Sequence, residues 1–192
     1  YDKSVWAAAR AELVSAGAWA PNLPYLIDTS SPVPLTETHT IMRHLAVTRP
    51  EHQLMGRSVL ETVKADQLSE VLHDCMAGLT NTTYTSWFAF APAREKWLSS
   101  SLPNQMSLLE ACCSSSAGSA ESSWWAAGPN LTYADFILYE FLAQAVAFAG
   151  RAAMFGSDGA AFPHLAALMD KFEALPNVVA YVESKAFLAQ PY

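Results

Sequence analysis

The strongest structural signal in this sequence is residues 130–150, NLTYADFILYEFLAQAVAFAG. This stretch predicts one helix with both of its ends marked. Thr132 is positioned as the N-cap, and Asp135, three residues later, can reach back to the Thr132 amide. The pair predicts a capping box with Asp where Glu or Gln is usual. Gly150 stands where a residue with a left-handed backbone would end the helix.

The predicted helix has no wide polar face, because apolar side chains occur nearly all round it. Such a helix belongs either in the middle of a core or in a membrane. Glu140 and Gln144, one turn apart, argue against a membrane span, since an acid at bilayer depth costs at least ~2.5 kcal/mol. The uninterrupted apolar runs are also far shorter than the ~20 residues that a span needs. We therefore interpret the stretch as the central helix of an all-α bundle.

The composition combines a hydrophobic share of 52% with a charged share of only 15%, against an average near ~25%. Two explanations fit this low share of charged residues. Part of the surface is buried against other chains, or Ser and Thr cover the outside of a large Ala/Ser-rich core. The net charge of −7 and the absence of any basic run argue against nucleic acid as a partner, because phosphate binding needs clustered cations. We predict no signal peptide and no transmembrane segment.

The three cysteines, Cys75, Cys112 and Cys113, form neither a metal-ligand pattern nor a disulfide framework. This usage favours an intracellular, reducing compartment. The five histidines show no metal-ligand spacing, so we predict no metal site.

The N-terminal quarter is predicted to be a helix, a β-hairpin and a second helix. Asp2 can cap the first helix, Gly17 ends it, and Thr36 or Thr38 caps the second, whose Ile41, Leu45 and His44 are expected to face inward. The predicted bounds are 2–16 for the first helix, 25–27 and about 35 for the strands, and 40–47 for the second helix. A linker at 49–51 then separates a first domain, 1–48, from a helical second domain, 54–192.

The second domain is predicted to be helical almost throughout. Its first helix, 56–76, carries an apolar stripe that should face the core: Val59, Leu60, Val63, Leu68, Val71 and Leu72. Residues 78–92 are aromatic and irregular in pattern. The remaining expected elements are one helix or two over 93–113, divided near Pro103, a Ser/Ala/Gly loop over 114–123, helices over 163–175 and 177–184, and a Pro-containing tail.

Four stretches of the sequence resemble the cytosolic glutathione transferases, most closely the mu and sigma classes. Residues 22–28, NLPYLID, are similar to a family segment whose proline is cis, and residues 35–41, LTETHTI, resemble the motif that opens the family's third helix. Two further matches are the WWAAG run at 124–128 with Asp135 and Phe136, and FPHL at 162–165 with Phe172, Glu173, Leu175 and Tyr181. The resemblance implies an α+β, mostly α protein: a truncated thioredoxin-like N-terminal half followed by the all-α C-terminal bundle of that family.

The resemblance also implies a glutathione site in the N-terminal half. Trp6 and Arg10 match the family's Trp and Lys that hold the glycine carboxylate, and both side chains donate hydrogen bonds to an anion. Asn22 and Leu23, which precede a cis Pro24, match the segment whose backbone pairs with the cysteinyl amide. Packing for Trp6, and a purely structural proline at position 24, are the alternatives.

Three further residues complete the set that the resemblance implies. Glu37 and Thr38 would take the γ-glutamyl amine and carboxylate, the latter with help from helix N-terminal amides. Asp66 matches the acid that reaches the glutathione amine of the neighbouring subunit in a dimer. Thr38 could instead be only a helix cap, and Asp66 only a solvated helix charge.

One part of the family pattern is unmatched. A strand–helix–strand block of ~30 residues precedes the family's counterpart of the helix at 2–16, and its first strand holds the Tyr or Ser hydroxyl that stabilises the glutathione thiolate. Tyr1 and Tyr25 are poor substitutes for it. We therefore assign no catalytic residue, and we expect little or no transferase activity from this chain by itself.

Without that block the hairpin has an open, apolar edge, and a lone two-stranded hairpin is barely stable in water. Two hypotheses of function follow from this open edge and the unmatched block. The favoured one is a structural or binding subunit of a larger assembly, in which another chain or a homodimer partner covers the edge. The alternative is an active glutathione transferase whose first segment was cleaved, is disordered or lies outside this sequence. Both take glutathione as the expected ligand.

Overall fold

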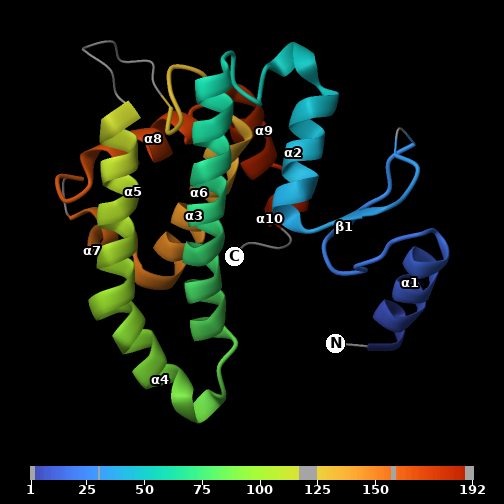
Figure 1. Ribbon diagram of the computed structural model, residues 1–192. Coiled ribbons are helices and arrows are strands. Elements are labelled where there is room, and N and C mark those ends of the chain that lie inside the picture. Colours follow the sequence, from blue (N-terminus) through green and yellow to red (C-terminus); the bar gives the residue numbers. More distant parts are fainter. Residues whose placement is uncertain (1–2, 30, 117–124, 157–158, 189–192) are drawn as a thin grey trace. The chain divides into compact units, whose positions relative to one another are not determined.

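The computed structural model describes residues 3–29, 31–116, 125–156 and 159–188 (Figure 1). Its contacts divide the chain into two compact units, Tyr1–Met55 and Gly56–Tyr192. Three predictions fall outside the described residues: the cap at Asp2, most of the loop over 114–123, and the Pro-containing tail.

The first unit contains the predicted helix, hairpin and second helix in the predicted order. Its elements are α1 (Lys3–Ser15), β1 (Tyr25–Leu26), β2 (Leu35–Thr36), α2 (Thr38–Thr48) and a short 3-10 helix, η1 (Pro50–His52). The strands are antiparallel, with Tyr25 opposite Thr36 and Leu26 opposite Leu35. Gly17 follows α1 with a φ of 93°, a backbone conformation that favours glycine, and thereby ends the helix as predicted.

Both predictions for the cap of α2 are wrong. The N-cap is Glu37, and no side chain makes a capping hydrogen bond there. Thr36 still belongs to β2, and its hydroxyl donates to the carbonyl of Ala20 at 2.8 Å. Thr38 is already the first helical residue, so its hydroxyl is one position too late to cap. Leu45, which was expected to face inward, is 43% exposed.

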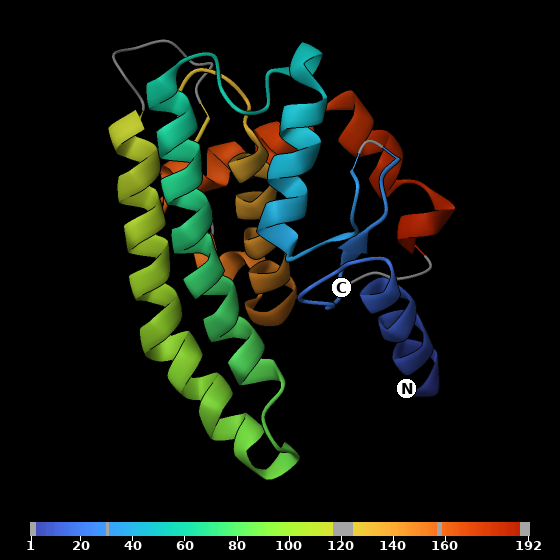
Figure 2. The ribbon, with the colours of Figure 1, turned by 45° about the vertical axis from the view of Figure 1, so that its right-hand side comes forward.

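In the described part of the second unit the regular elements are all helices, and Trp125 and Gly128 form an isolated β-bridge. Its elements are α3 (Val59–Thr83), α4 (Trp87–Lys96), a π-helix η2 (Trp97–Ser101), α5 (Leu102–Ser116), α6 (Tyr133–Ala149), α7 (Arg151–Phe155), α8 (Pro163–Glu173), α9 (Pro176–Val182) and α10 (Lys185–Leu188). In both ribbon views α3 and α5 run side by side and are joined at one end through α4 (Figures 1 and 2). No helix in the described ranges is both long and apolar enough to cross a bilayer.

Helix α6 is the central helix that the sequence predicts. It packs against α3 and α8, and its buried side chains include Ile137, Leu138, Phe141 and Leu142. The capping box between Thr132 and Asp135 is present, and it is made mainly through the Asp135 carboxylate: the Thr132 amide donates to it at 2.7 Å and the Thr132 hydroxyl at 2.9 Å. Gly150 ends the helix at φ 90° and ψ 139°; the positive φ favours glycine, but the ψ lies outside the left-handed helical region.

The predictions for the rest of the second unit are partly wrong. Val59, Leu60 and Val63 of the predicted stripe are 82%, 64% and 56% exposed, whereas Leu68 and Leu72 are buried. The segment 78–92, which looks irregular in sequence, is helical except at residues 84–86, since α3 continues to Thr83 and α4 begins at Trp87. The division expected near Pro103 is present as the π-helix η2, which ends directly before Leu102, the first residue of α5.

Candidate functional site

The segment before β1 and the start of α2 are tied together in the first unit. The Asn22 Nδ2 donates to Glu37 Oε1 at 3.5 Å, and the Leu23 amide donates to Asn22 Oδ1 at 2.9 Å. The bond from the Thr36 hydroxyl to the Ala20 carbonyl makes a second link between the same two segments. The structure therefore brings Asn22, Leu23 and Glu37 together, as the predicted site requires.

The Leu23–Pro24 peptide bond is cis, as the resemblance implies. Leu23 itself is 51% exposed, so its backbone lies at the surface. Its amide hydrogen is already taken by the Asn22 side chain. A ligand that pairs with this amide must displace Asn22, whereas pairing with the Leu23 carbonyl needs no such exchange.

The N-terminus of α2 has the character of an anion-binding position. Glu37 and Thr38 are both exposed, and the N-cap offers no side-chain acceptor to the first amides of the helix. Such amides and the helix dipole favour a negative group that lies next to them. Glu37 has a φ of 69°, unusual for a residue with a side chain, and its own carboxylate accepts from Asn22.

Trp6 and Arg10 lie four residues apart on α1 and therefore share one face of that helix. Trp6 is half-buried and Arg10 is exposed. An indole N–H and a guanidinium on the same face can both donate to one carboxylate. This arrangement is compatible with the role that the resemblance implies for the pair.

Asp66 lies in the second unit, on α3, and the Tyr133 hydroxyl of α6 donates to its Oδ1 at 2.6 Å. The residue is half-buried. The alternative of a merely solvated helix charge is therefore wrong, because the carboxylate links two core helices.

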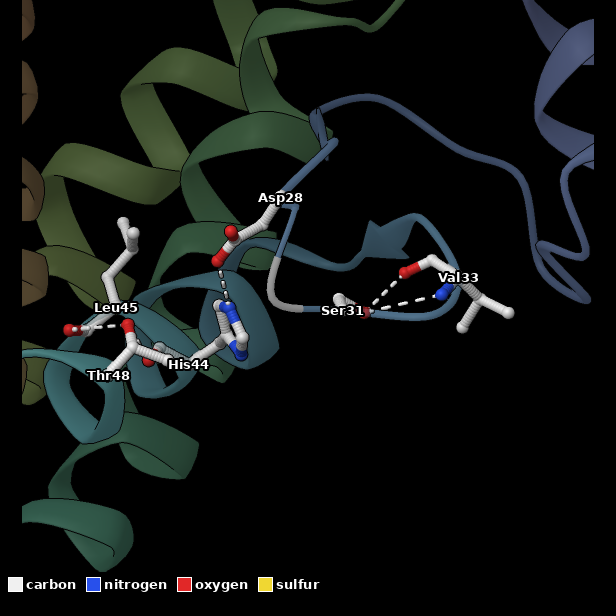
Figure 3. Close-up of polar contacts among 6 residues, drawn as sticks. All are labelled: Asp28, Ser31, Val33, His44, Leu45 and Thr48. Carbon is white, nitrogen blue, oxygen red and sulfur yellow. Dashed lines mark hydrogen bonds and ion pairs between the residues drawn. The ribbon is translucent and has the colours of Figure 1, made fainter.

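A polar contact that no sequence pattern predicted fastens the hairpin to α2. Asp28 follows β1, and His44 lies in the middle of α2; Figure 3 shows the Asp28 carboxylate facing the His44 ring, with 2.8 Å between Oδ2 and Nε2. Only 26% of the Asp28 side chain and 20% of the His44 side chain are exposed. In the hairpin turn, the Ser31 hydroxyl donates to the Val33 carbonyl at 2.5 Å. The Asp28–His44 contact ties the segment after β1 to the helix whose N-terminus forms the candidate site, and the Ser31–Val33 bond braces the turn.

No group of three or more His, Cys, Asp or Glu side chains in the described ranges could hold a metal ion. The three cysteines are free, and Cys75 and Cys113 are buried.

Comparison with known proteins gives consistent matches. Residues 73–185 match the family model described as "Glutathione S-transferase, C-terminal domain". The chain is 33% identical over 191 residues to "Glutathione S-transferase Mu 1" of Oryctolagus cuniculus, and 31% identical to "Glutathione S-transferase Mu 2" of Mus musculus; in each case all of this chain and 77% of the relative are covered.

Solved structures agree on the fold. A Pi-class glutathione S-transferase of Onchocerca volvulus superposes with a TM-score of 0.79 at 19% identity, covering 100% of this chain and 81% of that one. The glutathione S-transferase Blo t 8 superposes with a TM-score of 0.76 at 24% identity, covering 95% of this chain and 76% of that one. Similarities at this level of identity concern the fold alone.

Proposed function

Because the chain belongs to the glutathione S-transferase family, we propose that its first unit binds glutathione. The observation that carries the proposal is the junction at the start of α2. There the Asn22–Glu37 and Thr36–Ala20 hydrogen bonds hold the segment around Leu23 against the N-terminus of α2. The junction offers a backbone edge for a peptide and, at the helix N-terminus, a position for a carboxylate.

Each end of glutathione meets chemistry suited to it in this proposal. The carboxylate of the γ-glutamyl residue lies at the amides of α2 near Thr38, and the ammonium of the same γ-glutamyl residue faces the Glu37 carboxylate. The Leu23 carbonyl accepts from the cysteinyl amide. The glycine carboxylate accepts from the Trp6 indole and the Arg10 guanidinium. Asp66 keeps its proposed role toward the ligand of a second subunit.

Isothermal titration calorimetry with glutathione tests the proposal. Arg10→Ala removes one charge-assisted hydrogen bond, which is worth about 1.5–3 kcal/mol, so we expect Kd to rise roughly 10- to 100-fold. Trp6→Phe keeps the ring and removes only the donor, and we expect a smaller rise. Arg43→Ala is the matched control, because Arg43 is an exposed arginine of the same unit that the proposal leaves out. Equal Kd values for the Arg10 and Arg43 variants would disprove the assignment.

The hairpin supports a second proposal, that a further strand pairs with its edge. In the described residues the sheet has two strands only, so each strand is paired along one side, and three apolar side chains in and next to β1, those of Leu23, Tyr25 and Ile27, are 51%, 38% and 71% exposed. An apolar edge of this kind is a template for strand pairing. The strand can come from residues that precede Tyr1 in the same polypeptide or from another chain, and the second source is the structural-subunit hypothesis.

A thiol-conjugation assay separates these two sources. The structural-subunit hypothesis predicts that the 192-residue chain binds glutathione but conjugates it to a model electrophile no faster than the uncatalysed rate. The same uncatalysed rate should be found for the full gene product. Robust turnover by the full gene product would end that hypothesis and favour an active transferase.

The exposed residues at the start of α3 support a homodimer. Val59, Leu60 and Val63 form one turn-spaced apolar face that is more than half exposed at each position, and such faces mark interfaces. Val63→Lys should lower the mass measured by light scattering to that of a monomer. Val14→Lys, a change at an exposed valine of α1, is the control.

The three free cysteines fit a reducing, intracellular compartment, which we also propose for the protein.

A further inference from the structure

The corner between α3 and α4 exposes three large aromatic side chains. Tyr84, Trp87 and Phe88 are 87%, 89% and 71% exposed, and the rings of Trp87 and Phe88 meet edge to face at 6.0 Å. In both ribbon views this corner forms the far end of the α3–α4 projection, beyond the other helices of its unit (Figures 1 and 2). We call these three residues the aromatic corner. Large exposed apolar clusters usually mark an interaction site.

The aromatic corner lies in a long uncharged segment. Residues 75–93 contain no Asp, Glu, Lys, Arg or His, although the whole chain has a net charge of −7. The end of a projecting helical hairpin that faced only water would be expected to carry charged side chains. Without them, the segment avoids the main cost of entering a less polar medium, which is the desolvation of charges.

Several polar groups at the end of α3, next to the corner, are satisfied within their own helix. The hydroxyls of Thr82 and Thr83 donate to the carbonyls of Gly78 and Thr80, at 2.9 and 3.1 Å. The amide of Tyr84, at the end of α3, donates to the Thr80 carbonyl at 2.9 Å. These groups therefore need no water as a partner, which lowers the cost of moving the corner out of water.

We propose that the aromatic corner inserts shallowly into the interface of a zwitterionic lipid bilayer. Trp and Tyr prefer the headgroup level of a membrane, where the ring is apolar on one side and the polar atom stays wet. The absence of charges at the corner indicates which lipid it would bind. An uncharged corner on an anionic protein has no electrostatic attraction to anionic headgroups, so we expect it to bind a zwitterionic surface such as phosphatidylcholine. The attachment is peripheral and independent of glutathione binding.

Co-sedimentation of the full chain with phosphatidylcholine vesicles tests this proposal. Burial of one large apolar side chain is worth about tenfold or more in a partition equilibrium. The triple variant Tyr84→Ser, Trp87→Ser, Phe88→Ser should therefore bind at least about 100-fold more weakly. Trp19→Ser is the matched control, because Trp19 is a 94% exposed indole elsewhere, and it should bind like the wild type. Far-UV circular dichroism verifies that each variant is folded.

Two further measurements complete the test. Brominated phosphatidylcholine should quench part of the wild-type tryptophan fluorescence, and that part should disappear in Trp87→Phe. Light scattering without lipid should give the same mass for the wild type and the triple variant.

Four results would overturn the proposal: no binding of the wild type to phosphatidylcholine, equal binding of the triple variant, binding that requires added phosphatidylserine and is lost in salt, or a lower mass for the triple variant. The last result would assign the corner to contact with a second copy of the chain.

Discussion

Replacing Asp135 by Ala should destabilise the protein by about 3 kcal/mol. The side chain is 0% exposed, and its carboxylate accepts hydrogen bonds from the amides of Thr132 and Ala126 at 2.7 and 2.8 Å. Alanine leaves both buried amides without an acceptor, and each costs about 1–3 kcal/mol. Removing a buried charge relieves its desolvation, which offsets part of that loss. Asp135→Asn keeps one carbonyl acceptor, so we expect about half the effect.

Urea unfolding at pH 7, followed by circular dichroism and tryptophan fluorescence, measures this effect. Asp74→Ala, which removes an exposed carboxylate from α3, serves as the control and should change the free energy of unfolding by no more than about 0.5 kcal/mol. If Asp135→Ala loses no more than this control, the capping box does not hold the start of α6, and the reasoning fails.

The pH dependence of the same difference is a second test of Asp135. Burial raises the pKa of its carboxyl to about 6 from 3.8, although the hydrogen bonds from Thr132 and Ala126 work in the opposite direction. The folded protein therefore keeps this proton between about pH 4 and pH 6, whereas the unfolded chain has released it. The part of the stability that comes from retaining this proton is complete below about pH 4 and is lost as the pH rises through 6, whereas the hydrogen bonds that Asp135 accepts from Thr132 and Ala126 still contribute at pH 7.

This loss amounts to about 3 kcal/mol. Asparagine does not titrate, so the free energy of unfolding of the wild type minus that of Asp135→Asn should fall by this amount from about pH 4 to pH 7. A difference that stays constant or rises over this range would contradict the assignment.

The remaining predictions concern a buried carboxylate and the thiols. Glu61→Ala removes the acceptor that Asn130 Nδ2 reaches at 2.8 Å, and the cost of about 2 kcal/mol should lower Tm by roughly 4–8 °C; an unchanged Tm would show that the bond carries no net stability. Burial raises the pKa of Cys75 to about 11 and also raises that of Cys113, so a disulfide reagent at neutral pH should label at most one thiol of the native protein, that of Cys112, and all three after denaturation. Two or more labelled thiols in the native state would refute this.

The local signals of the sequence were enough to predict the elements that depend on neighbours in the chain. The capping box of α6 joins two residues that are three positions apart. Because that helix is apolar on nearly all sides, the sequence predicts that it lies in the core. The hairpin was predicted from two short apolar runs around a Pro/Ser turn. By contrast, the stripe on α3 has helical spacing along its whole length, and nothing local tells which of its turns meets other helices. Val59 and Leu72 therefore look alike in sequence, although one is 82% exposed and the other 0%.

The candidate site was predictable only in part, and only by resemblance. The motifs at 22–28 and 35–41 contain the residues that the Asn22–Glu37 bond joins. Contacts across long separations left no signal in the sequence: Tyr133 and Asp66 are 67 residues apart, and neither residue's neighbours point to the other. The same is true of Asp28 and His44. Side chains that tertiary packing brings together cannot be read from periodicity.

The most direct test of glutathione binding by the first unit is a titration followed by two-dimensional ¹H–¹⁵N NMR of the assigned chain. We predict that the amide signals of Leu23 and Thr38 and the indole signal of Trp6 shift together with one Kd, while the signals of α8 stay unchanged. No shift at saturating glutathione, or shifts confined to the residues after Gly56, would contradict the claim that the first unit holds the ligand.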